Sequence, residues 1–117
     1  MSRNIVDYLL NENSSSSNDH FILGRYGNMS FSELQNKINI YSNFFKKKLG
    51  KGEICILQAA NSPFFIQVYL SIMHSGNIVV PIDKTYNSKY IKNIIVQIKP
   101  KMLVCDNQTK INYIDLN

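Results

Sequence analysis

Apolar residues occur along this chain in two alternating arrangements, short uninterrupted runs and longer segments with gaps of three and four residues. The uninterrupted runs at 54–57, 78–80 and 102–105 are typical of buried strands covered on both faces. The segments at 63–74 and 88–98 have the length and spacing of helices. Strands that alternate with helices predict an α/β fold with three layers, in which crossover helices connect a mostly parallel sheet.

The clearest predicted helix begins near residue 30 and ends at Gly50, where a glycine can take a left-handed conformation. Two overlapping capping boxes are possible at its start, Ser32 with Gln35 or Ser30 with Glu33. Five apolar residues recur within it at three- and four-residue steps and predict one buried stripe: Leu34, Ile38, Tyr41, Phe45 and Leu49.

Weaker patterns flank this region. We expect a short amphipathic helix at 5–10, a flexible polar loop at 11–19, and a β-hairpin whose strands include 20–23 and 29–31. Residues 111–116 predict one more short strand. The predicted sheet is therefore preceded by a helix and a hairpin.

The chain has 117 residues, with 13 basic and 8 acidic residues and a net charge of +5. The lysines are scattered except at 46–48, the last turn of a predicted helix, where cations stabilise the helix dipole. Nucleic-acid-binding proteins more often cluster arginine with exposed aromatic residues, so we expect no nucleic-acid partner. No apolar stretch reaches the ~18 residues of a membrane span. We therefore expect no membrane partner, no signal peptide and a cytoplasmic location.

Residues that could ligate a metal are isolated from one another in the sequence. Cys55 and Cys105 lie within separate apolar runs, and neither has a histidine at ligand spacing. His20 and His74 are equally isolated. We interpret both cysteines as small buried apolar side chains and expect no metal site.

Two acidic residues, Asp83 and Asp106, follow predicted strands, the position at which open α/β sheets bind ligands. Aspartate after a strand is also common as a turn residue. The corner at 61–63 follows a strand and opens a helix, but Pro63 removes one amide that could hold an anion, so a plain helix cap is favoured. The segment 50–52 leaves a helix and enters a strand, the reverse of a phosphate loop. We assign no catalytic, cofactor-binding or metal-binding residue.

Four segments nevertheless resemble motifs of one family, the adenylate-forming superfamily of AMP-dependent synthetases and ligases. Residues 29–34 resemble its Thr/Ser-aromatic-x-Glu-Leu motif, 49–53 its Leu-Gly-x-x-x-Gly-Asp passage, and 60–66 its Asn-Ser-x-x-Phe/Tyr helix start. The most specific match is Met73–Asp83, which is similar to Leu-Lys-Ala-Gly-x-x-x-x-Pro-Leu/Ile-Asp.

The end of that last motif, Pro81-Ile82-Asp83 followed by Tyr86, resembles the amino-acid-adenylating branch, which includes peptide-synthetase adenylation domains and D-alanine–carrier protein ligases. The chain departs from the family in having His74-Ser75 in place of Lys-Ala and Asn87 in place of the usual proline.

The resemblance implies a reaction in which a carboxylate attacks the α-phosphorus of ATP with Mg²⁺, and a carrier or coenzyme A thiol then accepts the acyl group. In the family the phosphate loop, the adenine-stacking aromatic, the ribose-binding aspartate and the mobile lysine lie further along the chain. Residues 1–117 are thus expected to be the N-terminal portion of an adenylation domain, inactive alone and binding no cofactor by itself. The expected partner is the remainder of that enzyme or a carrier protein. The alternative is a non-catalytic interaction module that docks on a ligase or a carrier protein.

Overall fold

We describe the protein from a computed structural model, in which the described residues are 20–22, 28–60, 62–105 and 111–116. The helix predicted at 5–10, the loop predicted at 11–19 and the residue Asp106 lie outside the described residues.

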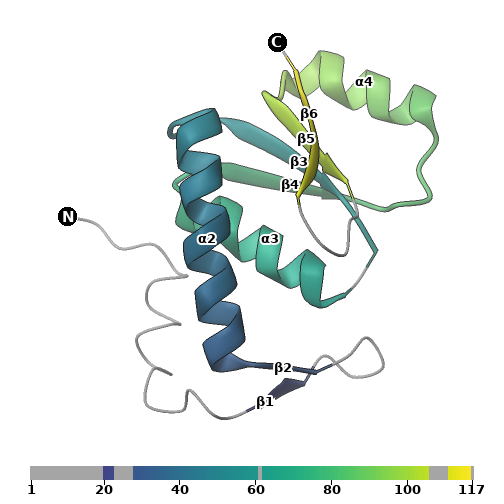
Figure 1. Ribbon diagram of the computed structural model, residues 1–117. Helices are drawn as coiled ribbons and strands as arrows, with labels where there is room; N and C mark the ends of the chain where they lie inside the picture. Colours follow the sequence, from purple (N-terminus) through teal and green to yellow (C-terminus); the bar gives the residue numbers. More distant parts are fainter. Residues whose placement is uncertain (1–19, 23–27, 61, 106–110, 117) are drawn as a thin grey trace.

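A four-stranded sheet with the order β4-β3-β5-β6 forms the centre of the structure. The inner strands β3 (Ile54–Gln58) and β5 (Met102–Cys105) pair in parallel, as do β3 and β4 (Ile78–Ile82). The final strand, β6 (Asn112–Asp115), is antiparallel to β5. The mostly parallel α/β sheet predicted from the sequence is confirmed, and the segment 111–116 does form a strand (Figure 1).

Two helices, α2 (Phe31–Leu49) and α3 (Pro63–His74), lie on one face of this sheet (Figure 1). The predicted stripe of α2 is buried throughout, and its C-terminal half packs on the sheet in a core that also contains Val68 and Ile72 of α3. The strand residues beneath these helices are completely buried: Cys55, Leu57, Met102 and Val104.

The predicted hairpin is also present, as β1 (His20–Ile22) paired antiparallel with β2 (Asn28–Ser30). Met29 of β2 joins Leu34 and Ile38 of α2 in a second buried cluster against α3. The hairpin is thereby attached to the helix pair and lies away from the main sheet (Figure 1).

Of the two possible capping boxes at the start of α2, the structure selects the earlier one. The Ser30 hydroxyl oxygen accepts a hydrogen bond from the Glu33 amide at 3.1 Å, so the helix begins at Phe31. The alternative cap, Ser32, is excluded because Ser32 already lies within the first turn. At the other end Gly50 has a φ of 74° and a ψ of −127°, a conformation that needs glycine but is not the left-handed helical one.

The third helix, α4 (Ser88–Ile98), lies on the opposite face of the sheet (Figure 1). Its isoleucines Ile91, Ile94, Ile95 and Ile98 pack on a cluster formed by Ile56, Ile82 and Leu103. No residue of α4 is itself fully buried, and Tyr90, beside the first of these isoleucines, is 48% exposed.

The segment β4 is a strand, as predicted, but the prediction that both of its faces are covered is wrong. Among the described strands β4 is at the edge of the sheet, and Ile78 is 52% exposed. The apolar run correctly indicates a strand, but it contains no information on how many neighbours the strand has. Pro81 lies within β4 and pairs with Leu57 of β3.

None of the helices in the described ranges combines the length and the hydropathy that crossing a bilayer requires.

Candidate functional site

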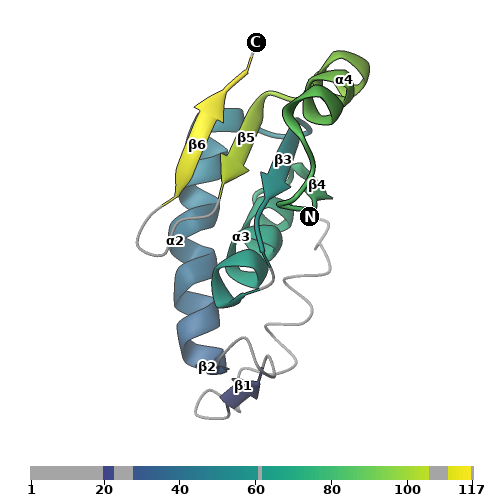
Figure 2. The same cartoon turned by 90° about the vertical axis from the view of Figure 1, so that its right-hand side faces the viewer.

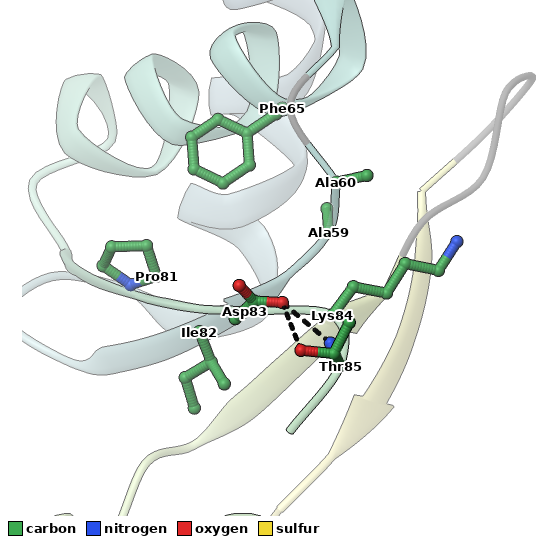
Figure 3. A pocket seen from close by; sticks show the side chains of 8 residues that line it. All are labelled: Ala59, Ala60, Phe65, Pro81, Ile82, Asp83, Lys84 and Thr85. Carbon is green, nitrogen blue, oxygen red and sulfur yellow. Dashed lines mark hydrogen bonds between the residues drawn. The ribbon is translucent and has the colours of Figure 1, made fainter. Parts of the chain in front are cut away.

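An open hollow of about 490 Å³ lies where β3 and β4 end and α3 begins (Figure 3). Ala59 and Ala60 line it directly after β3, and Asp83 to Thr85 line it directly after β4. Both strands run in the same direction, so their carboxyl ends meet at this edge of the sheet. Open α/β sheets bind ligands at this edge, which makes the hollow the candidate site.

Asp83 is the acidic side chain of the hollow, and it is held in a local turn. Its Oδ1 atom accepts two hydrogen bonds, from the backbone N–H and from the hydroxyl of Thr85, each at 2.8 Å (Figure 3). The backbone hydrogen bond, followed by the hydroxyl, lowers the pKa of Asp83 below its ordinary value. The carboxylate therefore remains negative at neutral pH.

Phe65 forms the apolar wall opposite Asp83, from the first turn of α3 (Figure 3). Its ring stacks on Tyr69 one turn later, with the centroids 5.8 Å apart and an angle of 25° between the planes. Pro81 lies on the same side of the hollow, whereas the Lys84 side chain extends away from the Asp83 carboxylate (Figure 3). The hollow is therefore lined on one side by a carboxylate and on the other by an apolar aromatic ring.

The described residues at the start of α3 are arranged as a helix cap and offer few free amides to an anion. The Ser62 hydroxyl oxygen accepts the Phe65 amide at 3.1 Å, and Pro63 has no N–H to offer. The nearby Asp83 carboxylate would also repel a phosphate group. The predicted cap by Ser62 is confirmed.

The described residues also offer no preformed cluster of metal ligands. Within the described ranges no three His, Cys, Asp or Glu side chains come together in a way that could hold a metal ion. Cys55 is completely buried, and burial raises its pKa to about 12, while Cys105 is half-buried. Of the two cysteines interpreted as buried apolar side chains, Cys55 fits that interpretation and Cys105 fits it only in part.

Sequence reasoning located part of this hollow. The turn interpretation of Asp83 is confirmed by its hydrogen bonds to Thr85, and Asp83 also lines the hollow, so its role in ligand binding stays a prediction. The sequence pattern did not indicate that Phe65 and Thr85 line the hollow. The motif containing Phe65 could have indicated its position, because that motif places the residue at the start of the helix that follows β3.

The AMP-binding enzyme family model matches residues 10–116 of this chain. No match was found among curated proteins. Among solved structures, the N-terminal subdomain of Klebsiella oxytoca NpsA superposes with a TM-score of 0.77 at 17% identity, over 93% of this chain and 29% of that one.

Two further structures are similar. VinN in complex with L-aspartate has a TM-score of 0.80 at 19% identity, over 92% of this chain and 31% of that one. The four-domain nonribosomal peptide synthetase AB3403, bound to AMP and glycine, has a TM-score of 0.79 at 18% identity, over 91% of this chain and 8% of that one.

At these identities the structural matches show a shared fold, and this chain spans less than a third of the proteins it resembles. The family model, by contrast, covers almost the entire chain. The chain therefore belongs to the AMP-binding enzyme family.

Proposed function

We propose that this chain is the N-terminal part of an ATP-dependent acid–AMP ligase and that it is not active by itself. The observation that carries the proposal is the combination of a family match over residues 10–116 with the chemistry of the hollow. The scaffold of an adenylating enzyme is present, whereas the described residues provide no phosphate cradle and no cluster of metal ligands.

In the complete enzyme a carboxylate oxygen of the acid attacks the α-phosphorus of ATP, and pyrophosphate leaves. A carrier or coenzyme A thiol then attacks the carbonyl carbon, and AMP leaves. ATP and Mg²⁺ are the cofactors of that reaction, and we expect the rest of the enzyme to provide the groups that bind them. Catalysis of this kind depends on positioning and on stabilisation of phosphate charge. This chain's contribution is a mostly parallel sheet. We also propose that the enzyme is cytoplasmic.

We further propose that the acid is an amino acid. The support is the sequence Pro81-Ile82-Asp83 and the nearby Tyr86. VinN with L-aspartate and AB3403 with glycine are consistent with this choice, but NpsA was solved with 3-hydroxybenzoyl-AMSN, so the shared fold does not distinguish the acids. The motif is therefore the basis of the preference.

An ATP–pyrophosphate exchange assay tests both parts of the proposal. The chain would be combined with the polypeptide encoded directly after the codon for Asn117, in the same frame or in the neighbouring gene. We expect exchange with a panel of amino acids and little with aryl or fatty acids. Exchange with aryl or fatty acids alone would refute the amino-acid assignment. Absence of a Thr/Ser/Gly-rich phosphate loop from that downstream polypeptide would refute the ligase assignment.

One observation favours a second function, a non-catalytic module that docks on a ligase or a carrier protein. Large apolar side chains are exposed, among them Ile78 and Ile114. A partner that covered either of these side chains would remove apolar surface from water. A chain that is monomeric in size-exclusion chromatography and binds no hydrophobic dye would exclude this function.

A further inference from the structure

Six exposed lysines gather at one edge of the sheet, although they come from two distant stretches of the chain, 46–51 and 99–101. The described residues contain ten lysines and no arginine, so more than half of their positive charge lies at this edge. We call these six side chains the lysine edge: Lys46, Lys47, Lys48, Lys51, Lys99 and Lys101.

Backbone hydrogen bonds hold the two stretches together. The Lys101 amide donates to the Ile54 carbonyl oxygen at 2.8 Å, and the Gly52 amide donates to the Gly76 carbonyl oxygen at 2.9 Å. The turns that precede β3, β4 and β5 therefore lie side by side at the amino ends of these parallel strands. The C-terminal end of α2 lies at the same end of the sheet in both views (Figures 1 and 2).

Stabilisation of helix ends accounts for only part of this charge. The helices α2, α3 and α4 all end at this edge, and each C-terminus carries about half a negative charge. The edge also contains two carboxylates, Glu53 and Asp115, the second paired with Met102 at the start of β5. Six lysines against two carboxylates leave four positive charges, which is more than the three helix ends balance.

Little of the remaining charge is neutralised by local contacts. Lys101 forms an ion pair with Glu53 at 3.5 Å, and the Lys48 Nζ atom lies 5.1 Å from the centre of the Tyr113 ring. Within the part of the chain that the structure describes, the other four lysines of the edge form no ion pair. Exposed like charges held this close repel one another, so binding of an anionic surface would relieve the repulsion.

The composition of the edge favours an acidic protein surface over a nucleic acid or a phospholipid bilayer. Arginine, which binds phosphate with two parallel hydrogen bonds, does not occur among the described residues of the edge. Its aromatic side chain, Tyr113, is half-buried and offers no open ring for a base to stack on. Glu53 and Asp115 would repel a uniform array of phosphates, whereas a protein surface can pair with charges of both signs.

From these observations we propose that the lysine edge is an interaction surface for an acidic segment of a separate partner protein. The proposal goes beyond the proposed function and does not depend on it. The candidate site lies at the opposite ends of the strands, and β3 between the two spans five residues, or about 17 Å. A partner on the lysine edge therefore leaves the hollow beside Asp83 open.

Fluorescence anisotropy with a labelled helical peptide of glutamate and alanine tests this surface. In 0.15 M salt the Debye length is about 8 Å, so only nearby lysines contribute strongly. We expect Lys47→Gln/Lys51→Gln to weaken binding about threefold or more. The matched control, Lys89→Gln/Lys92→Gln, removes the same charge at exposed positions about 10–15 Å from Lys99 along α4, and should have little effect. Thermal unfolding establishes that each variant is folded.

Each outcome decides for or against the lysine edge. A larger loss in the edge variant than in the control supports it. Equal losses would show that only net charge matters, and absence of peptide binding would also overturn it. Tighter binding of a DNA duplex or of phosphatidylserine vesicles, lost in the same edge variant, would replace the protein partner. Displacement of the peptide by the polypeptide encoded after the codon for Asn117 would make the edge an internal interface of the enzyme, while the ligase assignment stands.

Discussion

The Asn77 side chain joins two turns that lie 24 residues apart in the sequence, because its Oδ1 atom accepts a hydrogen bond from the Glu53 amide at 2.9 Å. Its Nδ2 atom donates to the Gly50 carbonyl oxygen at 3.0 Å and to the Ser75 hydroxyl oxygen at 2.9 Å. Asn77 is 6% exposed, so its side-chain amide forms its hydrogen bonds with these protein groups and not with water. The end of α2 and the end of α3 are fixed together at the entrances to β3 and β4.

Replacement of this asparagine should be costly. Asn77→Ala leaves the Glu53 amide and the Gly50 carbonyl oxygen without their partner, and we expect the free energy of unfolding to fall by about 1–3 kcal/mol. Chemical denaturation measures the change. Asn93→Ala, at an exposed position of α4, is the control and should change stability by less than about 0.5 kcal/mol. Equal effects of the two variants would contradict the role given to Asn77.

Gly76 ends α3 with a φ of 87°, a region that side chains disfavour. We expect Gly76→Ala to destabilise the protein by about 1 kcal/mol and Gly76→Val by about 1–3 kcal/mol, as measured by denaturant unfolding. A Cβ at this position would be 3.5 Å from Lys51 Cγ, an ordinary contact. The cost should therefore persist in the double variant Gly76→Ala/Lys51→Ala. Restored stability in that double variant would show that crowding, and not backbone conformation, is the cause.

Cys55 should make the protein less stable in alkaline solution. Its folded pKa of about 12 lies above the ordinary value of 9.0, so the unfolded chain loses the thiol proton first. Below pH 9 both states are protonated and the effect is absent. As the pH rises from 9 toward 12, stability should fall by up to about 1.4 kcal/mol per pH unit from this group. Comparison with Cys55→Ala isolates the contribution, since other groups titrate in the same range. Identical pH profiles would contradict it.

The Asp83 turn predicts a measurable titration shift. Thr85→Val removes the hydroxyl hydrogen bond but keeps the backbone one, so the pKa of Asp83 should rise partway toward its ordinary value. Thr85→Ser retains both donors and should leave the pKa where it is. Because the folded pKa is depressed, the associated stabilisation is present at neutral pH and is lost as the pH falls through that pKa. NMR titration of the carboxyl carbon provides the measurement, and a pKa that is the same in Thr85→Val as in the unmodified protein would refute the contribution of the Thr85 hydroxyl.

The sequence was sufficient to predict the main helices and strands, because the residues that begin and end each element agree with the apolar spacing inside it. Ser62, Pro63 and Gly76 determine where α3 begins and ends, and the isoleucine spacing of α4 identifies its inner side. The choice between Ser30 and Ser32 was not decidable from the pattern, since both precede an acceptable capping partner. The burial of β4 could not be predicted either, because strand order depends on contacts distant in sequence.

The candidate site was less predictable than the fold. Asp83 could be selected as a candidate because it directly follows a predicted strand. The hollow itself could not be predicted, because it is formed only where β3, β4 and α3 converge. The bridge from Asn77 to Glu53 had no local signal, as the two residues are joined only when β3 and β4 pair. Motif order and spacing indicated the family, and the family model confirms that resemblance.

The central proposal is that this chain has the scaffold of an adenylating enzyme and that the groups that bind nucleotide lie outside it. Titration calorimetry of MgATP into the isolated 117-residue chain tests it most directly. We predict no binding at millimolar nucleotide, with the fold intact by circular dichroism. Saturable binding of MgATP in the micromolar range would contradict the claim.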